Sequence, residues 1–237
     1  MDKAKYDQHF MLDGKLLKEI VSYADLEKTD VVLEIGFGRG YLTRNLCKKC
    51  KVIAVDVDDS FTLDLKNVEV QHGNILKMIE KLEFNKIVSN IPYSISEPLL
   101  KKMFKKEFEL AVLTVGDSFY EVIADKTRRL GFLAQCFFDV EKMQDVSRKA
   151  FYPEPRTDSV VVKLTRKKRS DFEEALHKLV LQDDKKIKNG LLKLFEKKKT
   201  KKEMKKLFEE KFFDKKMYEL SNEEFFSFID VLKTKIL

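Results

Sequence analysis

Short β-branched runs that alternate with helical segments constrain the fold of this 237-residue chain more than any other sequence feature. Residues 31–35 are typical, because the run is short, apolar and rich in valine, and glycine follows it directly, as expected of a buried strand. Hydrophobic periodicity predicts strands at residues 31–35, 52–55, 68–70, 86–88, 110–114, 138–145 and 159–164, and helices at 15–26, 40–46 and 75–82. This order indicates an α/β fold with a doubly wound, mostly parallel Rossmann-like sheet, whose ligands bind at the carboxyl ends of the strands.

The sequence changes character after residue 166. Residues 167–237 contain one glycine and no proline, and their apolar residues recur at helical spacing. We therefore expect an α/β domain over residues 1–166 and a small all-helical C-terminal domain over residues 167–237. Lysines at 197–199 and 201–202 are candidate phosphate contacts, although a charge run is more often a solvated helix face.

Composition narrows the classes of protein that remain. The formal net charge of +7 is compatible with a polyanionic partner. No apolar run approaches the roughly 18 residues of a membrane span, and no signal-like stretch opens the chain, so we expect a cytoplasmic protein. Cys47, Cys50 and Cys136 are expected to be reduced thiols, and the lone Cys47–Cys50 spacing is too weak a signal for a metal site.

The first chemical signal is a glycine-rich loop between a predicted strand and a predicted helix, which contains Gly36 and Gly38. Glycines let the backbone approach a nucleotide, although they also serve purely structural turns. Asp56 follows Gly36 by twenty residues, at the end of the second strand, where a carboxylate can accept hydrogen bonds from both ribose hydroxyls unless it is simply solvated. The Gly-x-Gly-x-Gly pattern favours S-adenosylmethionine over NAD, and Asn74 can hydrogen-bond the adenine edge of that cofactor.

The most specific signal is Asn90-Ile91-Pro92-Tyr93, at the end of the fourth predicted strand. The exocyclic amine of adenine is a poor nucleophile, because its lone pair is delocalised into the ring. The Asn90 side chain and the Ile91 carbonyl can accept hydrogen bonds from the amine and turn its lone pair toward the cofactor methyl group. Tyr93 can stack on a base that has left its helical stack. The alternative is a purely structural role, in which the motif is only a strand end followed by a rigid proline turn.

These motifs resemble those of the KsgA-like ribosomal RNA adenine dimethyltransferases, whose relatives include the Erm resistance methylases. The resemblance covers nearly the whole chain. Residues 8–13 resemble the family's N-terminal segment, which closes over the cofactor. Residues 151–159 resemble its Phe-x-Pro-x-Pro-x-x-x-Ser run, in which the phenylalanine helps to hold the target base. Residues 185–191 resemble the basic segment that opens its helical C-terminal domain.

The resemblance implies a reaction, a cofactor and a partner. The reaction is dimethylation of adenine N6 with S-adenosyl-L-methionine, and the partner is ribosomal RNA in the small ribosomal subunit. The implied catalytic residues are Asn90, Ile91, Pro92, Tyr93 and Phe151. The implied cofactor-binding residues are Gln8, His9, Met11, Gly36, Gly38, Asp56, Asn74 and Asn90. We expect a monomer that uses no metal and binds no membrane, and Lys126, Arg128 and Arg129 are candidate RNA contacts.

Four of these positions depart from the family's usual residues. His9 stands in place of Asn, Met11 in place of Leu, Asp56 in place of Glu and Asn74 in place of Asp. Asp56 keeps the capacity to bind ribose with a shorter reach, and Asn74 keeps an acceptor without the charge. Residues 115–129 also diverge, in a region that helps to meet RNA in the family, so the sequence points to the chemistry more directly than to the substrate.

The sequence leaves three functions open. The first is the methyltransferase, and the second is a binding protein that keeps the cofactor fold and assists ribosome assembly without methylating. Asn90, Tyr93 and Phe151 favour the enzyme, because a pure binder does not need two base-stacking rings beside a cofactor loop. The third is methylation of a protein side-chain amide, which uses an Asn-Pro-Pro-Tyr-like motif. Ile91 and the 151–159 run count against it.

Overall fold

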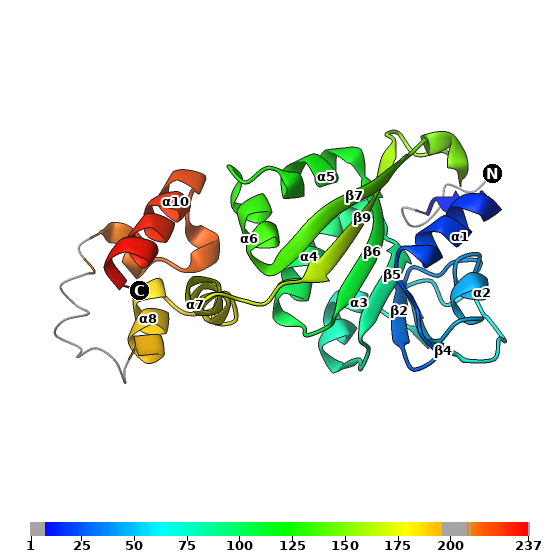
Figure 1. Cartoon of the computed structure of the whole chain (residues 1–237), viewed down its shortest axis with the longest axis horizontal. Helices are drawn as coiled ribbons and strands as arrows, with labels where there is room; N and C mark the ends of the chain where they lie inside the picture. Colours follow the sequence, from blue (N-terminus) through cyan, green and yellow to red (C-terminus); the bar gives the residue numbers. More distant parts are fainter. Residues whose placement is uncertain (1–7, 196–207, 209, 237) are drawn as a thin grey trace. The chain divides into compact units, whose positions relative to one another are not determined.

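The chain folds into two compact units (Figure 1). The computed structural model describes residues 8–195, 208 and 210–236. The first unit contains the chain up to Ala124 together with Phe138–Arg166, and the second contains Asp125–Phe137 together with the chain from Lys167 onward. The segment 125–137 therefore leaves the first unit between two of its elements and returns to it at Phe138.

The first unit is built on a seven-stranded sheet in the order β4-β3-β2-β5-β6-β9-β7. Its strands are β2 (Val31–Ile35), β3 (Lys51–Asp56), β4 (Val68–His72), β5 (Lys86–Asn90), β6 (Leu110–Gly116), β7 (Phe138–Val146) and β9 (Ser159–Arg166). Strands β2 to β6 pair in parallel, whereas β9 runs antiparallel to both β6 and β7. The predicted Rossmann-like sheet is confirmed, and each predicted strand lies within an observed one.

The described residues of the first unit form five helices, and the three that were predicted from the sequence are shorter than their patterns suggested. The five helices are α1 (Gly14–Ser22), α2 (Thr43–Leu46), α3 (Ile75–Met78), α4 (Ser96–Lys105) and α5 (Asp117–Ala124), with 3-10 turns at Ile79–Lys81, Tyr93–Ile95 and Arg148–Ala150. The Asp13 side chain caps α1 by accepting hydrogen bonds from the backbone N–H groups of Lys15 and Leu16. The apolar face of α1 then packs on one face of the sheet, where Val32, Val52 and Val88 belong to the same buried cluster.

A two-stranded ribbon that periodicity did not predict joins distant parts of the first unit. Strand β1 (Phe10–Met11) pairs antiparallel with β8 (Phe151–Tyr152), so that Phe10 faces Tyr152 and Met11 faces Phe151. Two-residue strands carry no detectable period, which is why the sequence pattern missed them. The ribbon ties the N-terminal segment to the turn before β9.

The second unit is helical in the residues described. It contains α6 (Arg129–Phe137), α7 (Asp171–Val180), α8 (Ile187–Phe195) and α10 (Asn222–Val231), with 3-10 turns at Lys211–Asp214 and Met217–Glu219 and a π-helical segment at Leu232–Ile236. The lysines at 197–199 and 201–202 lie outside the described residues. Within residues 8–195, 208 and 210–236, no helix combines the length and the apolar composition that crossing a membrane requires.

Arg129 explains why residues 125–137 belong to the second unit. Its Nη1 donates to the carbonyl oxygens of Leu220, Met217 and Tyr218, at 2.9, 3.4 and 3.5 Å. Asn222 adds two bonds, because its side chain accepts from the Arg129 backbone N–H at 3.0 Å and donates to the Thr127 carbonyl at 3.0 Å. The Arg129 guanidinium is therefore engaged inside the unit, which is a structural role that the sequence prediction of an RNA contact did not anticipate.

Candidate active site

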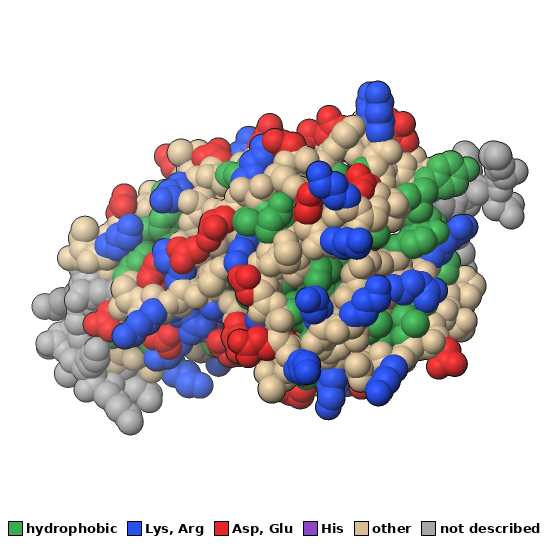
Figure 2. All heavy atoms as spheres, turned by 45° about the vertical axis from the view of Figure 1, so that its right-hand side comes forward, with side chains coloured by type: hydrophobic (Ala, Val, Ile, Leu, Met, Phe, Trp, Pro, Cys, Tyr) green, Lys and Arg blue, Asp and Glu red, His purple; other side chains and the backbone are tan. Residues whose placement is uncertain are grey.

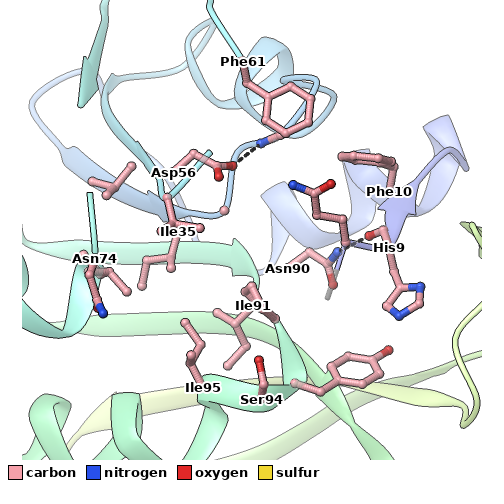
Figure 3. Close-up of a pocket in the computed structure, with 18 of the residues that line it drawn as sticks. His9, Phe10, Ile35, Asp56, Phe61, Asn74, Asn90, Ile91, Ser94 and Ile95 are labelled. Carbon is pink, nitrogen blue, oxygen red and sulfur yellow. Dashed lines mark hydrogen bonds between the residues drawn. The ribbon is translucent and has the colours of Figure 1, made fainter. Parts of the chain in front are cut away.

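A pocket lies at the carboxyl ends of neighbouring strands β3, β2 and β5, as expected for a sheet of this topology (Figure 3). Ten of the residues predicted from the sequence line it, namely Gln8, His9, Gly36, Gly38, Asp56, Asn74, Asn90, Ile91, Pro92 and Tyr93. Segments far apart in the chain are thus brought to one place by the strand order.

The glycine loop after β2 has a backbone that only glycine adopts easily. Gly36 and Gly38 have φ angles of +72° and +48°. A Cβ on Gly38 would lie 2.6 Å from a ring carbon of Phe10, so the ring packs directly on the glycine backbone. The loop is fixed to β3 because the Gly36 N–H donates to the Val55 carbonyl at 2.7 Å. The glycines therefore allow Phe10 and Pro92 to pack closely against the loop at the wall of the pocket.

Asp56 is held rigidly at the end of β3. Its Oδ2 accepts a hydrogen bond from the Gly38 N–H at 2.8 Å, and its Oδ1 accepts from the Asp58 N–H at 2.9 Å. Each carboxylate oxygen has a second lone pair, so both oxygens can still accept a ribose hydroxyl. Asp58 in turn accepts from the Gln8 side chain at 3.0 Å, which fastens the N-terminal segment over this edge of the pocket.

Only one end of the Asn90 side-chain amide has a hydrogen-bond partner in the protein. Its Nδ2 donates to the His9 backbone carbonyl at 3.1 Å, as the dashed line in Figure 3 shows. A carbonyl can only accept, so this bond fixes which end of the amide is the donor. The remaining atom, Oδ1, is buried and has no hydrogen-bond partner in the protein. A buried acceptor without a partner indicates that a ligand supplies the donor.

Tyr93 follows Asn90 by three residues, and its ring lines the same pocket. The Tyr93 hydroxyl forms a short hydrogen bond with the hydroxyl of Ser159 at the start of β9. The Tyr93 ring lies 6.1 Å from the His9 ring, with 29° between the two planes. The pocket therefore has aromatic walls close to the unpartnered oxygen of Asn90.

Met11 and Phe151 are the two predicted site residues that the structure does not bring into the pocket. Their side chains are 4% exposed and belong to the buried core beneath the ribbon. The reason is the alternation of side chains along a strand, because Phe10 faces the pocket and its neighbour Met11 must face the opposite way. Phe151 pairs with Met11 across the ribbon and shares that inward direction.

Several pocket residues were not predicted from the sequence. They are Phe10, Ile35, Val55, Val57, Phe61, Gly73, Ile75, Ser94 and Ile95. Phe10 makes an edge contact with Phe61 at 5.8 Å, and the Arg39 guanidinium lies 5.2 Å from the Phe10 ring centre. Most of them are immediate neighbours of predicted site residues in the chain, so motifs extended by one residue at each end would include them.

Glu34 is a buried carboxyl group next to the pocket. It lies in β2, its side chain is 2% exposed, and its Oε2 has no hydrogen-bond partner. Burial, together with the nearby charge of Asp56, raises the pKa of Glu34 to about 8. Glu34 is therefore mostly protonated at neutral pH. Periodicity places this residue in a predicted buried strand but gives no sign of its protonation.

The arrangement fits a nucleoside cofactor with a sulfonium methyl donor. The glycine loop lines the pocket, Asp56 can hold a ribose, and Asn90 offers an unused acceptor beside them. No group of three or more His, Cys, Asp or Glu side chains in the described parts of the chain could hold a metal ion. Fold and site together define a methyltransferase of the S-adenosylmethionine-dependent class.

The chain belongs to the ribosomal RNA adenine dimethylase family, whose model matches residues 1–231. It is 36% identical over 199 residues to a probable ribosomal RNA small subunit methyltransferase A of Pyrococcus abyssi, covering 78% of this chain and 74% of that protein. It is 38% identical over 178 residues to the ribosomal RNA small subunit methyltransferase A of Thermotoga neapolitana, covering 70% and 68%. The family resemblance read from the motifs is confirmed.

Solved structures agree with this assignment. A dimethyladenosine transferase from Plasmodium falciparum superposes with a TM-score of 0.66 and 25% identity, covering 96% of this chain and 98% of that one. The 23S rRNA methyltransferase ErmE shares the fold, with a TM-score of 0.62, 22% identity and coverage of 95% and 100%. The protein is thus an RNA adenine methyltransferase with S-adenosylmethionine as its cofactor.

Proposed function

We propose that this protein dimethylates adenine N6 in the RNA of the small ribosomal subunit. The observation that carries the proposal is the buried Oδ1 of Asn90, an acceptor without a protein partner at the carboxyl end of β5. The printed names of the relatives from Pyrococcus abyssi and Thermotoga neapolitana support the small subunit as the source of the substrate.

The proposed mechanism relies on position and hydrogen bonds rather than on a strong base. Asn90 Oδ1 and the carbonyl of Ile91 accept the two N–H groups of the adenine amine, which turns the nitrogen lone pair out of the ring plane. The bound cofactor supplies the electrophilic methyl group. Ile91 is itself anchored, because its N–H donates to the Thr114 carbonyl of β6 at 3.3 Å. Pro92 stiffens the turn, and Tyr93 stacks on the flipped base.

The remaining site residues are proposed to hold the cofactor. Asp56 accepts from the ribose hydroxyls, Asn74 meets the adenine edge, and Gln8 keeps the N-terminal segment closed through its bond to Asp58. The Asn74 side chain already caps α3 by accepting from the Leu76 N–H at 2.9 Å, so its Nδ2 is the end that can meet the cofactor. Met11 and Phe151 act from the core side, where they support the ribbon that carries Phe10 and His9.

The RNA backbone is proposed to meet basic residues on more than one surface. Neighbouring helices α1 and α2 and the turn after α2 expose Lys15, Lys18, Arg44, Lys48 and Lys49. Figure 2 turns this side of the first unit forward, and Lys and Arg side chains gather on its lower right. Exposed positive charge of this kind supplies phosphate contacts that do not depend on sequence.

The functions of the two parts of the chain are also a proposal. The first unit supplies the methyltransferase domain. The second unit, which adds residues 125–137 to the predicted helical domain of residues 167–237, contributes to RNA binding, with Lys126 and Arg128 as its exposed candidates. Arg128 already pairs with Asp125 at 3.2 Å, so its phosphate contact competes with that ion pair. The protein is proposed to act as a monomer in the cytoplasm.

The test is methyl transfer to its proposed substrate. Small ribosomal subunits that lack dimethyladenosine are incubated with the protein and S-adenosylmethionine carrying a labelled methyl group, and the modified adenines are mapped. We expect dimethyladenosine at discrete positions of the small-subunit RNA. Tight cofactor binding without any transfer to these subunits would instead support the assembly-factor function, and transfer to a ribosomal protein would support amide methylation.

A further inference from the structure

An exposed tyrosine lies on the pocket side of the two-stranded ribbon. Tyr152 in β8 is 63% exposed, and it pairs with Phe10 of β1. Directly opposed residues of antiparallel strands project from the same face of the ribbon. Phe10 lines the pocket, as Figure 3 shows, whereas Met11 and Phe151 face the core. Tyr152 therefore lies beside the wall that Phe10 forms, although it does not line the pocket itself.

The same face of the ribbon carries a second exposed apolar side chain. The Leu12 N–H donates to the Ala150 carbonyl at 3.1 Å, so the pairing of the two segments continues one residue beyond β1. Side chains alternate along an extended segment, so Leu12 projects to the side of Phe10, and it is 52% exposed. An exposed aromatic ring and an exposed aliphatic chain thus offer an apolar surface next to the pocket.

Positive charge borders Tyr152 in the chain and across the ribbon. Lys149 and Arg156 are exposed and lie on either side of β8 in the chain, and the exposed Arg39 guanidinium lies 5.2 Å from the centre of the Phe10 ring. Within the part of the chain that the structure describes, none of these three side chains forms an ion pair. All three cations can therefore contact phosphates.

The acidic side chains of the same turn are already engaged. Glu154 pairs with Arg148 at 3.0 Å, and the Asp158 side chain accepts from the Arg148 backbone N–H at 2.8 Å. The charge that this surface offers to a ligand is therefore positive. An exposed aromatic ring among available cations is the combination that binds single-stranded nucleic acid, because bases stack on the ring and phosphates contact the cations.

We propose that Tyr152 is a stacking platform for the nucleotide next to the target adenine in the RNA strand, with Arg39, Lys149 and Arg156 on the phosphates beside it. This inference rests on the proposed function and extends it from the target base to the strand that carries the base. An adenine that leaves its stack for the pocket leaves one face of its neighbour uncovered. Tyr152 covers that face, and it accepts any neighbouring base because every base has a π-face.

The experiment separates stacking from charge at this surface. The affinity for methyl-deficient small ribosomal subunits would be measured with S-adenosylhomocysteine present, over a series of salt concentrations. We expect Tyr152→Ala to weaken binding about 10-fold at every salt concentration, which is in the lower part of the range for loss of one base–aromatic stack. Tyr152→Phe keeps a ring, so its affinity should stay within about 3-fold of wild type.

The charge arm uses the double variant Lys149→Gln/Arg156→Gln. Loss of phosphate contacts reduces the dependence of affinity on salt, by about 0.7 in the slope of log affinity against log salt for each contact to a single strand. Tyr152→Ala should leave this slope at its wild-type value, because stacking releases no counterions. An unchanged slope in the double variant would indicate a contact with a ribosomal protein rather than with RNA phosphates, and it would overturn the platform.

Tyr218→Ala is the matched control, because Tyr218 is 59% exposed and belongs to the second unit. It should bind subunits as wild type does, and all variants should bind S-adenosylhomocysteine within about 2-fold of wild type. The platform is also overturned if Tyr152→Ala keeps the wild-type affinity, if Tyr152→Phe is as weak as Tyr152→Ala, or if Tyr218→Ala is weakened equally. In each of these cases wild-type protein that methylates the subunits leaves the proposed function standing. Wild-type protein that methylates no subunit RNA overturns the proposed function and the platform together.

Discussion

The buried carboxyl group of Glu34 makes the stability of this protein depend on pH in a defined direction. Its pKa rises from 4.5 to about 8 on folding, because burial penalises the charged form and Asp56 is close. The folded state therefore binds the proton more tightly than the unfolded state. Stability from this group is fully present below pH 4.5 and is lost as the pH rises through about 8.

The size of the effect follows from the shift. Each pKa unit corresponds to about 1.4 kcal/mol, so integrating between pH 5 and pH 9 gives a loss of about 4 kcal/mol from Glu34 alone. Glu34→Gln keeps the shape of the side chain and cannot ionise. The free energy of unfolding of the wild type, relative to that of Glu34→Gln, should therefore fall by about this amount across the same interval.

Urea unfolding of both proteins at a series of pH values between 5 and 9 measures the difference directly. Other titrating groups contribute equally to both proteins and cancel in the comparison. Glu141→Gln is the matched control, because Glu141 is exposed on β7, and its difference from wild type should not vary with pH in this way. A difference for Glu34→Gln that stayed constant from pH 5 to pH 9 would refute the reasoning.

Two further predictions concern cofactor affinity and stability. Asp56→Ala should weaken the binding of S-adenosylhomocysteine, measured by calorimetry, by about 1.5 to 3 kcal/mol, which is the range for hydrogen bonds to a charged group. An unchanged affinity would show that Asp56 does not bind the ribose. Arg129→Ala should lower the free energy of unfolding of the second unit by about 2 to 3 kcal/mol, because a guanidinium that donates to three backbone carbonyls is lost. Arg128→Ala is its control and should have little effect on stability, since its ion pair with Asp125 is exposed.

The sheet was predictable from the sequence because its strands are long enough to carry a period. Residues 31–35 match β2 at both ends, and the polar residues that end β3 and β5 lie where parallel topology brings them together. The site predictions at Asp56 and Asn90 combined that topology with the spacing of their motifs and with the family resemblance. Both side chains line one pocket, although their elements are separated by β4 and α3 in the chain.

Two site predictions stay untested, and the structure adds a side-chain direction or a long-range contact that the sequence did not indicate. A motif names Phe151, but only the register of β1 against β8 shows that Phe10 faces the pocket and that Phe151 faces the core. Arg129 looked like an RNA contact because arginine is charged, whereas three distant carbonyls hold its guanidinium. Neither the direction of Phe151 nor the bonds of Arg129 produce a periodic pattern in the sequence.

Asn90 separates the enzyme from the binding protein most sharply. Its Nδ2 bond to the His9 carbonyl leaves Oδ1 as the acceptor, so Asn90→Ala removes the group that orients the adenine amine. Turnover at saturating cofactor should fall at least about 100-fold, comparable to the loss of one hydrogen bond in the transition state. S-adenosylhomocysteine affinity should stay close to wild type.

Asn74→Ala provides the contrast, because Asn74 lines the same pocket at the cofactor end and does not approach the amine in the proposed mechanism. This substitution should weaken cofactor binding and leave the single-turnover rate at saturating cofactor nearly unchanged. If Asn90→Ala retained more than about a tenth of wild-type turnover under the same conditions, its oxygen could not be the acceptor for the amine. The unpartnered Oδ1 would then need another ligand donor, and the proposed geometry at β5 would be wrong even though the protein methylates RNA.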